Sequence, residues 1–383
     1  MRKDLRVFVN AVSVREGGPR VVLVKLLAAM RRERPDLQIA VAAPAAICDE
    51  VSDSVTLRQP VSVGQSPLGI AKWYEWDLAK AARRWSADVV FSVTNYLPLR
   101  RLSMPTLLLE QHAGHFSPVF DRLLYSESPS ARERLAWGPT RHWVHRSVEL
   151  ATVLTVQSAA LAEAVAGATR VPRERIKVVP HGPGWVEPSD EPPAGARDSA
   201  ALRIGYISKS GVQKNFTTLF KAVKLLSERG RDIRLVVTLD PADVYAVATL
   251  SQAEALGIAH LVENCGEFAP DAIAGLYDSL DVFVFPSLCE SFGMPMVEAM
   301  ARGLCVVVAD TPVNREIVGE AGIVFSALDA AALAAQLDRL CDDPGARRSR
   351  ALKSLCRARD FSWQSAAQGT LAALDAAVRN HGR

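Results

Sequence analysis

The chain has 383 residues, of which 49% are hydrophobic and 23% charged, and its formal net charge is +3. This composition is typical of a soluble globular protein, and no run of eighteen apolar residues is present that could span a membrane. The length exceeds that of one ordinary hydrophobic core, so we expect two domains of similar size.

The charge is unevenly distributed along the chain. Residues 1–180 contain 25 Lys and Arg against 17 Asp and Glu, a balance of +8, and the remaining residues contain 20 against 25, a balance of −5. A basic first half favours an anionic acceptor or membrane surface on that side. A scattered, solvated surface would give the same balance.

The cysteines and the first residues indicate the compartment. Six cysteines, at positions 48, 265, 289, 305, 341 and 356, show neither C-x-x-C pairing nor zinc spacing. The first residues run from charge directly into an apolar stretch and lack a signal peptide's cleavage site. We therefore expect free thiols in a reducing cytoplasm, with Cys289 as a small loop residue.

Short apolar strands alternate with helical periodicity along the chain. Strands are expected at residues 5–9, 37–43, 89–93, 107–109, 153–156, 202–207, 235–238, 261–265, 282–285 and 306–309, with helices from about residue 19 and over 363–379. A segment at 182–198, rich in Pro, Gly and acidic residues, predicts a linker. The rhythm predicts an α/β fold of two Rossmann-like, doubly wound parallel-sheet domains, with ligands at the carboxyl ends of the strands.

Two segments of the first half place small or polar residues directly after a strand. Gly17 and Gly18 lie where a strand gives way to a helix, and glycines there permit close approach of a phosphate. His112 and His115 follow the strand at 107–109. No third ligand cluster supports a zinc site, so we expect a binding-loop histidine. His112 is favoured because it follows the strand more directly, and a packed polar role remains open for either residue.

The second half opens with a strand, a short loop and a helix. Lys209 and Lys214 flank the loop, where a diphosphate could be held without a metal, although two solvated lysines would give the same pattern. Asn215 is a favourable N-cap for the following helix. That helix has an apolar face of Leu219, Ala222, Val223 and Leu226.

The stretch from Phe285 to Met300 contains two glutamates separated by seven residues, Glu290 and Glu298. It predicts a strand, a turn and a helix that starts at Pro295. The helix start offers free N–H groups and a partial positive charge to an anion, and Gly293 lets the backbone approach it. The two carboxylates could grip the hydroxyls of a ligand that carries both sugar and phosphate, or merely favour a helix N-terminus.

This stretch resembles the E-x7-E signature of the retaining GT-B fold glycosyltransferases of family 4 (glycosyl transferases group 1). The lysine loop resembles that family's Gly-Arg-x-x-x-x-Lys element, with Ser208 in place of its Gly and Lys209 in place of its Arg. Lysine keeps the charge but lacks the bidentate geometry of Arg. Residues 155–158, 175–182 and 310–322 resemble further landmarks of the family. The resemblance is strong over 150–326 and weak over the first 150 residues.

The resemblance implies a domain organisation and a reaction. Residues 1–182 would form the acceptor-binding domain and 199–362 the nucleotide-sugar-binding domain, the two facing a cleft, with a helix over 363–383 packing back on the first. A hexosyl group would pass from a nucleotide diphosphate sugar to an acceptor hydroxyl with retention of anomeric configuration. The nucleotide diphosphate sugar is then a co-substrate. Because no Asp-x-Asp motif is present, we expect no metal and no other cofactor.

The resemblance also assigns residues. It implies catalytic roles for Glu290, His112 and Lys214, with Glu290 on the sugar hydroxyls and Glu298 on the ribose. The implied donor-binding set is Gly17, Gly18, Lys209, Lys214, Glu290, Ser291, Phe292, Gly293, Met294 and Glu298.

The acceptor lies beyond what the motifs specify. We expect first a lipid-linked saccharide in surface-polysaccharide assembly. The alternative acceptor is a small secondary metabolite. The alternative functions are those of a nucleotide-sugar epimerase and of an inactive sugar-nucleotide-binding partner of another transferase. No nucleic-acid motif accompanies the modest basic balance, so no nucleic-acid partner is expected.

One segment suggests where a membrane would be met. In residues 131–146, four arginines (Arg132, Arg134, Arg141 and Arg146) are interleaved with Trp137 and Trp143. This composition is typical of a helix lying on anionic lipid and predicts a cytoplasmic protein that is peripheral to the membrane. Pro139 interrupts the segment, and both tryptophans could instead be core residues.

Overall fold

The computed structural model describes residues 5–63, 66–193 and 201–381, and these form two compact units. The first unit comprises residues 1–116, 136–182 and 362–383, and the second comprises 117–135 and 183–361. Parts of the expected linker (194–198) and of the expected last helix (382–383) lie outside the described residues.

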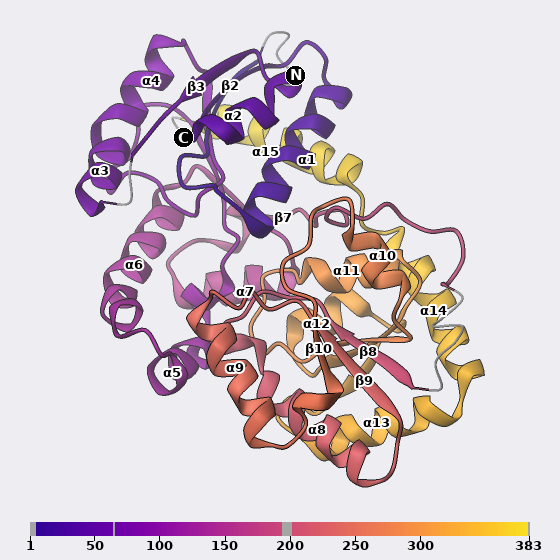
Figure 1. The fold of residues 1–383 in the computed structure, drawn as a ribbon. Helices are drawn as coiled ribbons and strands as arrows, with labels where there is room; N and C mark the ends of the chain where they lie inside the picture. The colour runs from indigo at the N-terminus through magenta and orange to yellow at the C-terminus, as the bar shows by residue number, and fades with distance from the viewer. Residues whose placement is uncertain (1–4, 64–65, 194–200, 382–383) are drawn as a thin grey trace. The chain divides into compact units, whose positions relative to one another are not determined.

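The first unit is built on a seven-stranded parallel sheet of order β3-β2-β1-β4-β5-β6-β7 (Figure 1). Its strands are β1 (Arg6–Asn10), β2 (Gln38–Ala43), β3 (Leu57–Pro60), β4 (Val89–Ser92), β5 (Thr106–Leu109), β6 (Val153–Val156) and β7 (Ile176–Val178). Its helices are α1 (Gly17–Glu33), α2 (Ala45–Glu50), α3 (Pro67–Lys72), α4 (Leu78–Arg84), most of α6 (Ala131–Leu150), α7 (Ala159–Ala168) and α15 (Trp363–Asn380). The central strands are buried along their length, as parallel strands covered on both faces must be.

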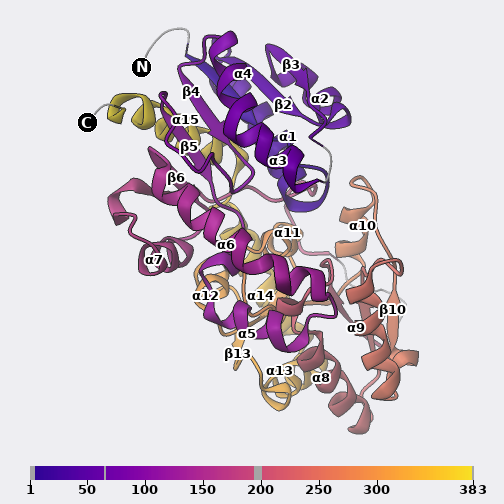
Figure 2. The same cartoon turned by 90° about the vertical axis from the view of Figure 1, so that its left-hand side faces the viewer.

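Helix α15 completes the first unit. It packs against α1 and against β4, β5 and β6, and Figure 2 shows it alongside β4 and β5. At its start the Trp363 ring stacks on His181, with ring centroids 5.5 Å apart. A Cβ atom at the neighbouring Gly182 would collide with Trp363, so only glycine allows this close approach.

The second unit is built on a six-stranded parallel sheet of order β10-β9-β8-β11-β12-β13. Its strands are β8 (Leu202–Tyr206), β9 (Ile233–Val237), β10 (Val262–Asn264), β11 (Val282–Phe285), β12 (Cys305–Ala309) and β13 (Ile323–Phe325). Its helices are α5 (Pro118–Glu127), α8 (Phe216–Glu228), α9 (Val244–Ala255), α10 (Ile273–Asp278), α11 (Met294–Ala301), α12 (Pro312–Val318), α13 (Ala330–Asp342) and α14 (Pro344–Ala358). Counted in chain order, this is the 3-2-1-4-5-6 order of dinucleotide-binding sheets.

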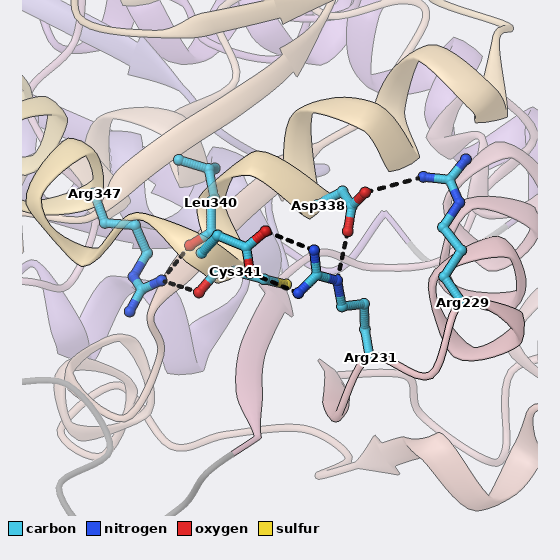
Figure 3. A network of polar contacts seen from close by, with 7 residues as sticks. Arg229, Arg231, Asp338, Leu340, Cys341 and Arg347 are labelled. Carbon is cyan, nitrogen blue, oxygen red and sulfur yellow. Dashed lines mark hydrogen bonds and ion pairs between the residues drawn. The ribbon is translucent and has the colours of Figure 1, made fainter.

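Ion pairs link α13 to the turn after α8 (Figure 3). The Arg231 guanidinium bonds both carboxylate oxygens of Asp342 at 2.6 Å and also Asp338 at 2.6 Å. Arg229 reaches the second oxygen of Asp338 at 3.3 Å. These charges lie near the surface, where solvent screens them, so each pair contributes little to stability.

Residues 117–135 belong to the second unit, although the expected boundary placed all of 1–182 in the first domain. Helix α5 packs on the turn at Val212–Lys214. The hydroxyl of Tyr245, near the start of α9, lies 2.6 Å from Ser128 Oγ and also bonds Glu133. The two contacts of Tyr245 join residues more than a hundred positions apart, and no local pattern indicates them.

The two doubly wound parallel sheets confirm the expected fold class, and the fully apolar strands lie where they were expected. Three short strands were not predicted: β3, β7 and β13. Strand β3 has the sequence Leu-Arg-Gln-Pro, lies at the sheet edge and is largely exposed. Proline and polar residues are tolerated at an edge, but they hide the strand from pattern analysis.

Candidate active site

The loop between β11 and α11 holds the first glutamate of the motif. Gly293 adopts a left-handed conformation, with φ of +78°, and a Cβ atom there would collide with Met296. Helix α11 begins at Met294, one residue before the expected start, and no side chain caps its first turn. The glycine therefore turns the chain sharply into a helix whose first N–H groups carry no side-chain cap.

Glu290 and Lys214 form one ion pair. Lys214 Nζ lies 2.6 Å from Glu290 Oε1, and each side chain is only 14% exposed. The Ser287 hydroxyl donates to the same oxygen at 2.7 Å. The structure thus brings together two of the three expected catalytic residues, which are contributed by loops 76 positions apart.

The backbone around Lys214 is held firmly by the loop after β11. The Leu288 N–H donates to Gln213 O at 2.9 Å, and the buried Tyr206 hydroxyl donates to Lys214 O at 3.1 Å. Asn215 occupies the expected N-cap position, but its side chain does not cap the helix. It donates instead to Pro286 O and Ala327 O, at 3.0 and 2.9 Å. Asn215 therefore fixes the loop that positions Lys214.

Lys209 differs sharply from Lys214 in its surroundings. Its side chain is 53% exposed, and its Nζ lies 3.6 Å from Glu267, which is itself exposed. A pair in this environment is weak because solvent screens it and two flexible side chains must be ordered. The two lysines of the loop are therefore not equivalent, and Lys214 has the fixed geometry.

Glu298, the second glutamate of the motif, is buried within α11 and only 8% exposed. The Tyr277 hydroxyl donates to its Oε2 at 2.7 Å, and the Trp185 N–H donates to its Oε1 at 3.2 Å. Burial raises the pKa of Glu298 to about 6, although both hydrogen bonds act to lower it. A close approach of Gly184 to the carboxylate leaves no room for a Cβ atom.

The other donor-site residues of this loop surround the turn. Ser291 and Met294 are half-buried. The Phe292 ring is buried and packs edge-on against Phe361, with centroids 5.6 Å apart. Its expected contact with a donor therefore rests on its backbone. Burial raises the pKa of the Cys289 thiol to about 12, which makes it a poor nucleophile.

The glycines of the first unit lie at the start of α1. Gly17 is the first residue of the helix and has a φ of +64°, a conformation that favours glycine. A Cβ atom at Gly18 would meet nothing within 4 Å. The turn therefore requires Gly17, whereas Gly18 leaves open space beside the helix start.

The two histidines after β5 have different environments. The His115 ring is buried and stacks on Trp137, with centroids 4.7 Å apart and an interplanar angle of 12°. Burial lowers the pKa of His115 to about 2, so the ring is neutral. The His112 ring is half-buried and lies 4.7 Å from that of His115. The backbone N–H of His112 donates to the buried carboxyl of Glu110 at 2.9 Å. His115 is thus a packed core residue, and the expectation for His112 stays a prediction.

Both tryptophans of the arginine-rich segment are packing residues. Trp137 stacks on His115, as described above. Trp143 packs against Tyr74 and Tyr96, and its indole N–H donates to Leu97 O at 2.7 Å. The core alternative for these residues therefore fits the structure better than an interfacial one. The side chains that face solvent on α6 include Arg132 and Leu135, the latter 81% exposed.

Several residues that complete the site gave no signal in the sequence. Ser287 bonds Glu290, and the Asn314 amide donates to Ser287 O at 3.1 Å. Tyr277 and Trp185 bond Glu298. Their contacts depend on tertiary structure, although Ser287 lies within the stretch from Phe285 to Met300 and Asn314 within the family-like string at 310–322.

Among residues 5–63, 66–193 and 201–381, no group of three or more His, Cys, Asp and Glu side chains is arranged to hold a metal ion. Within the same ranges, no helix combines the length and apolar character that crossing a membrane would require.

Comparison with known proteins identifies the type of domain. Residues 201–343 match the family described as Glycosyl transferases group 1. The MMP alpha-(1->4)-mannosyltransferase of Mycolicibacterium hassiacum is 32% identical over 236 residues, covering 60% of this chain and 55% of the relative. The O-antigen chain mannosyltransferase B of Escherichia coli is 33% identical over 105 residues, covering 27% and 28%. The chain thus spans about half, or less, of the length of these relatives.

Solved structures share the whole fold. Anabaena HepE in complex with UDP-glucose superimposes with a TM-score of 0.70, covering 97% of this chain and 99% of that one, at 17% identity. At 17% identity the match shows a shared fold and nothing further.

Proposed function

We propose that this chain, whose residues 201–343 match the group 1 glycosyltransferases, transfers a hexosyl group from a nucleotide diphosphate sugar to an acceptor hydroxyl. The observation that carries the proposal is the pair of Lys214 and Glu290, with Nζ and Oε1 2.6 Å apart, beside the uncapped start of α11. A cation and a helix N-terminus suit a diphosphate, and a fixed carboxylate suits the hydroxyls of the sugar next to it.

The donor class is supported by the relatives as well as by the site. Two of them are named as mannosyltransferases, and a protein of the same fold was solved with UDP-glucose. A nucleotide diphosphate mannose and UDP-glucose are therefore the first donors to test. Glu298 is proposed to receive the ribose hydroxyls.

The proposed reaction needs no covalent bond to the protein. The bond between the anomeric carbon and the diphosphate oxygen breaks, and its electron pair stays on the diphosphate. Lys214 and the first N–H groups of α11 stabilise that developing charge. The acceptor oxygen then bonds the anomeric carbon from the same face, and its proton passes to the departing phosphate oxygen. The configuration is therefore retained, without the nucleophilic carboxylate of retaining glycosidases.

For the acceptor we propose a lipid-linked saccharide in surface-polysaccharide assembly. The O-antigen enzyme among the relatives supports this class, and so does the +8 charge balance of residues 1–180. The protein would then work as a peripheral protein on the cytoplasmic face of an anionic membrane. Exposed Arg132 and Leu135 on α6 are the proposed contact, because a basic and an apolar side chain side by side suit such a surface.

The test begins with a panel of nucleotide sugars in a thermal-shift assay, since a ligand that binds only the folded state raises the melting temperature. The selected donor is then incubated with and without lipid-linked acceptors. Turnover that needs an acceptor and yields a product of retained configuration supports the proposal. Change of the sugar without acceptor would identify an epimerase, and binding without turnover across lipid-linked and small-molecule acceptors would contradict a transferase.

A further inference from the structure

We infer that Tyr277 is a positioning residue for donor binding, whose hydroxyl holds the Glu298 carboxylate in the orientation and charge state that receive the ribose. This inference rests on the proposed function, because it assigns a task to a residue behind the proposed ribose-binding group. Tyr277 lies on α10, outside the sequence motif that contains Glu298.

The packing of the Tyr277 ring directs its hydroxyl at the Glu298 carboxylate. The side chain is fully buried, and its ring packs against Phe283 with centroids 5.8 Å apart. From this fixed ring the hydroxyl reaches Glu298 Oε2 at 2.7 Å. A buried hydroxyl costs free energy unless it is hydrogen-bonded. A phenylalanine would fill the same space without that cost, so packing alone does not explain the hydroxyl.

Each oxygen of the Glu298 carboxylate accepts one hydrogen bond from the protein and can accept another. Oε2 accepts from Tyr277, and Oε1 accepts from the Trp185 N–H at 3.2 Å. An ionised carboxylate has about four acceptor positions, so roughly two remain for the hydroxyls of a ribose. With both oxygens fixed, those two positions point in set directions before a donor arrives.

The same hydroxyl favours the ionised form of Glu298. Burial is the largest influence and raises the pKa of Glu298 to about 6, while the bonds from Tyr277 and Trp185 lower it. The other charged residues on or directly after the two helices, Asp278 on α10 and Arg302 after α11, pair with each other at 2.5 Å. Removal of the Tyr277 hydroxyl therefore raises the pKa of Glu298 further. Near pH 6 to 7 more of the carboxyl would then be protonated and would accept fewer bonds.

The test is Tyr277→Phe, measured by calorimetric binding of the nucleotide sugar that most stabilises the wild-type protein. Removal of the hydroxyl raises the pKa of Glu298 and lowers its ionised fraction near pH 6, so donor affinity there should fall several-fold. At pH 8.5 the Glu298 carboxyl is ionised in both proteins, so only the lost orientation remains and the loss of affinity should be smaller. Once turnover is measured, the donor KM should follow the same pattern while kcat changes little.

Tyr245→Phe is the matched control. It also removes a phenol hydroxyl that bonds a glutamate in the same unit, but that glutamate is Glu133, and Tyr245 lies on α9, outside the motif. Its donor affinity should equal that of wild type at both pH values. Melting temperatures of both variants establish that the fold is retained.

Each outcome separates the inference from the proposed function. A several-fold loss at pH 6 that becomes smaller at pH 8.5, in Tyr277→Phe alone, supports the positioning role. Equal affinity of Tyr277→Phe and wild type at both pH values overturns it and leaves the proposed function intact. An equal loss at both pH values also overturns it, because the hydroxyl then has no effect on the charge state of Glu298. Failure of the wild-type protein to bind any nucleotide sugar removes the proposed function and the inference with it.

Discussion

Lys214 Nζ lies 2.6 Å from Glu290 Oε1, so the proposed phosphate-binding cation and the proposed sugar-binding acid fix each other's position. Each group is desolvated, and each therefore needs the other or a ligand as partner. A diphosphate that approaches Lys214 meets a cation already oriented by Glu290. The sugar beyond it meets a carboxylate already oriented by Lys214 and Ser287. Substitution of either residue should thus affect both halves of the donor.

Glu290→Gln should reduce turnover by about tenfold to a hundredfold, because a hydrogen bond to a charged group is worth roughly 1.5–3 kcal/mol. The fold should persist, since the amide oxygen can still accept from Ser287. Steady-state kinetics and a melting curve measure the two effects. The control is Glu267→Gln, which neutralises the exposed partner of Lys209 and should leave turnover unchanged. Wild-type rates for Glu290→Gln would contradict the assignment.

Lys214→Ala should weaken donor binding at least tenfold, and Lys209→Ala should weaken it less. Lys214 is 14% exposed and fixed by Glu290, whereas Lys209 is 53% exposed and pairs with Glu267 at 3.6 Å. Loss of Lys214 should also lower the free energy of unfolding by about 1–3 kcal/mol, because Glu290 then keeps only Ser287. Titration calorimetry and urea unfolding test both statements. Equal donor affinity of both variants and wild type would exclude a diphosphate site here.

Glu298→Gln should stabilise the protein near neutral pH and weaken donor binding. The folded-state pKa of about 6 lies above the ordinary value of 4.5, so the folded state holds this proton to higher pH than the unfolded state does. The contribution of Glu298 to the free energy of unfolding therefore falls as pH rises from about 4.5 to 6. The total change is up to about 2 kcal/mol.

Urea unfolding of both proteins from pH 4 to pH 8 tests this sign. The free energy of unfolding of the variant minus that of the wild-type protein should grow between about pH 4.5 and pH 6 and stay nearly constant at higher pH. The donor KM of Glu298→Gln should rise with little change in kcat, since ribose contacts persist into the transition state. A difference that is independent of pH would mean that Glu298 is not the buried titrating group.

Turnover should survive EDTA, because Lys214 and the start of α11 take the place of a metal at the diphosphate. Activity measured in excess chelator, with and without added manganese or magnesium, provides the test. Inactivation by EDTA that either metal reverses would overturn this expectation and reopen a metal role for His112 and His115.

The protein should sediment with anionic vesicles at low salt and be released as salt rises, since each basic residue near such a surface contributes about 1 kcal/mol. Arg132→Ser combined with Leu135→Ser should weaken this binding. Arg348→Ser with Leu352→Ser alters the same exposed residue types on α14 and serves as the control. If the wild-type protein stays in the supernatant at low salt, a small-molecule acceptor becomes the better proposal.

The parts of the fold that were predictable are those with a local cause. Strands β6 and β11 are continuous apolar runs because both of their faces are buried, and they lie where they were expected. The two-glutamate stretch indicated Glu290, and the lysine loop indicated Lys214. Their ion pair joins residues 76 positions apart, and it forms because the sheet brings the two loops together. The bond from Tyr277 to Glu298 has no local signature either, because α10 and α11 meet only in the folded protein.

The packing of α15 on β4, β5 and β6 bears on how the chain folds during synthesis. The ribosome completes the second unit, which ends at residue 361, before it has made the helix that covers these three strands. Until Leu371 and Leu374 arrive, the face of the first sheet that they bury lacks this cover. Domains generally fold as they emerge from the ribosome, the N-terminal domain first. Here the first unit begins earlier in the chain but is completed only after the second unit, because it includes α15. We expect nascent chains that stop before residue 363 to bind chaperones and to resist proteases only over the second unit.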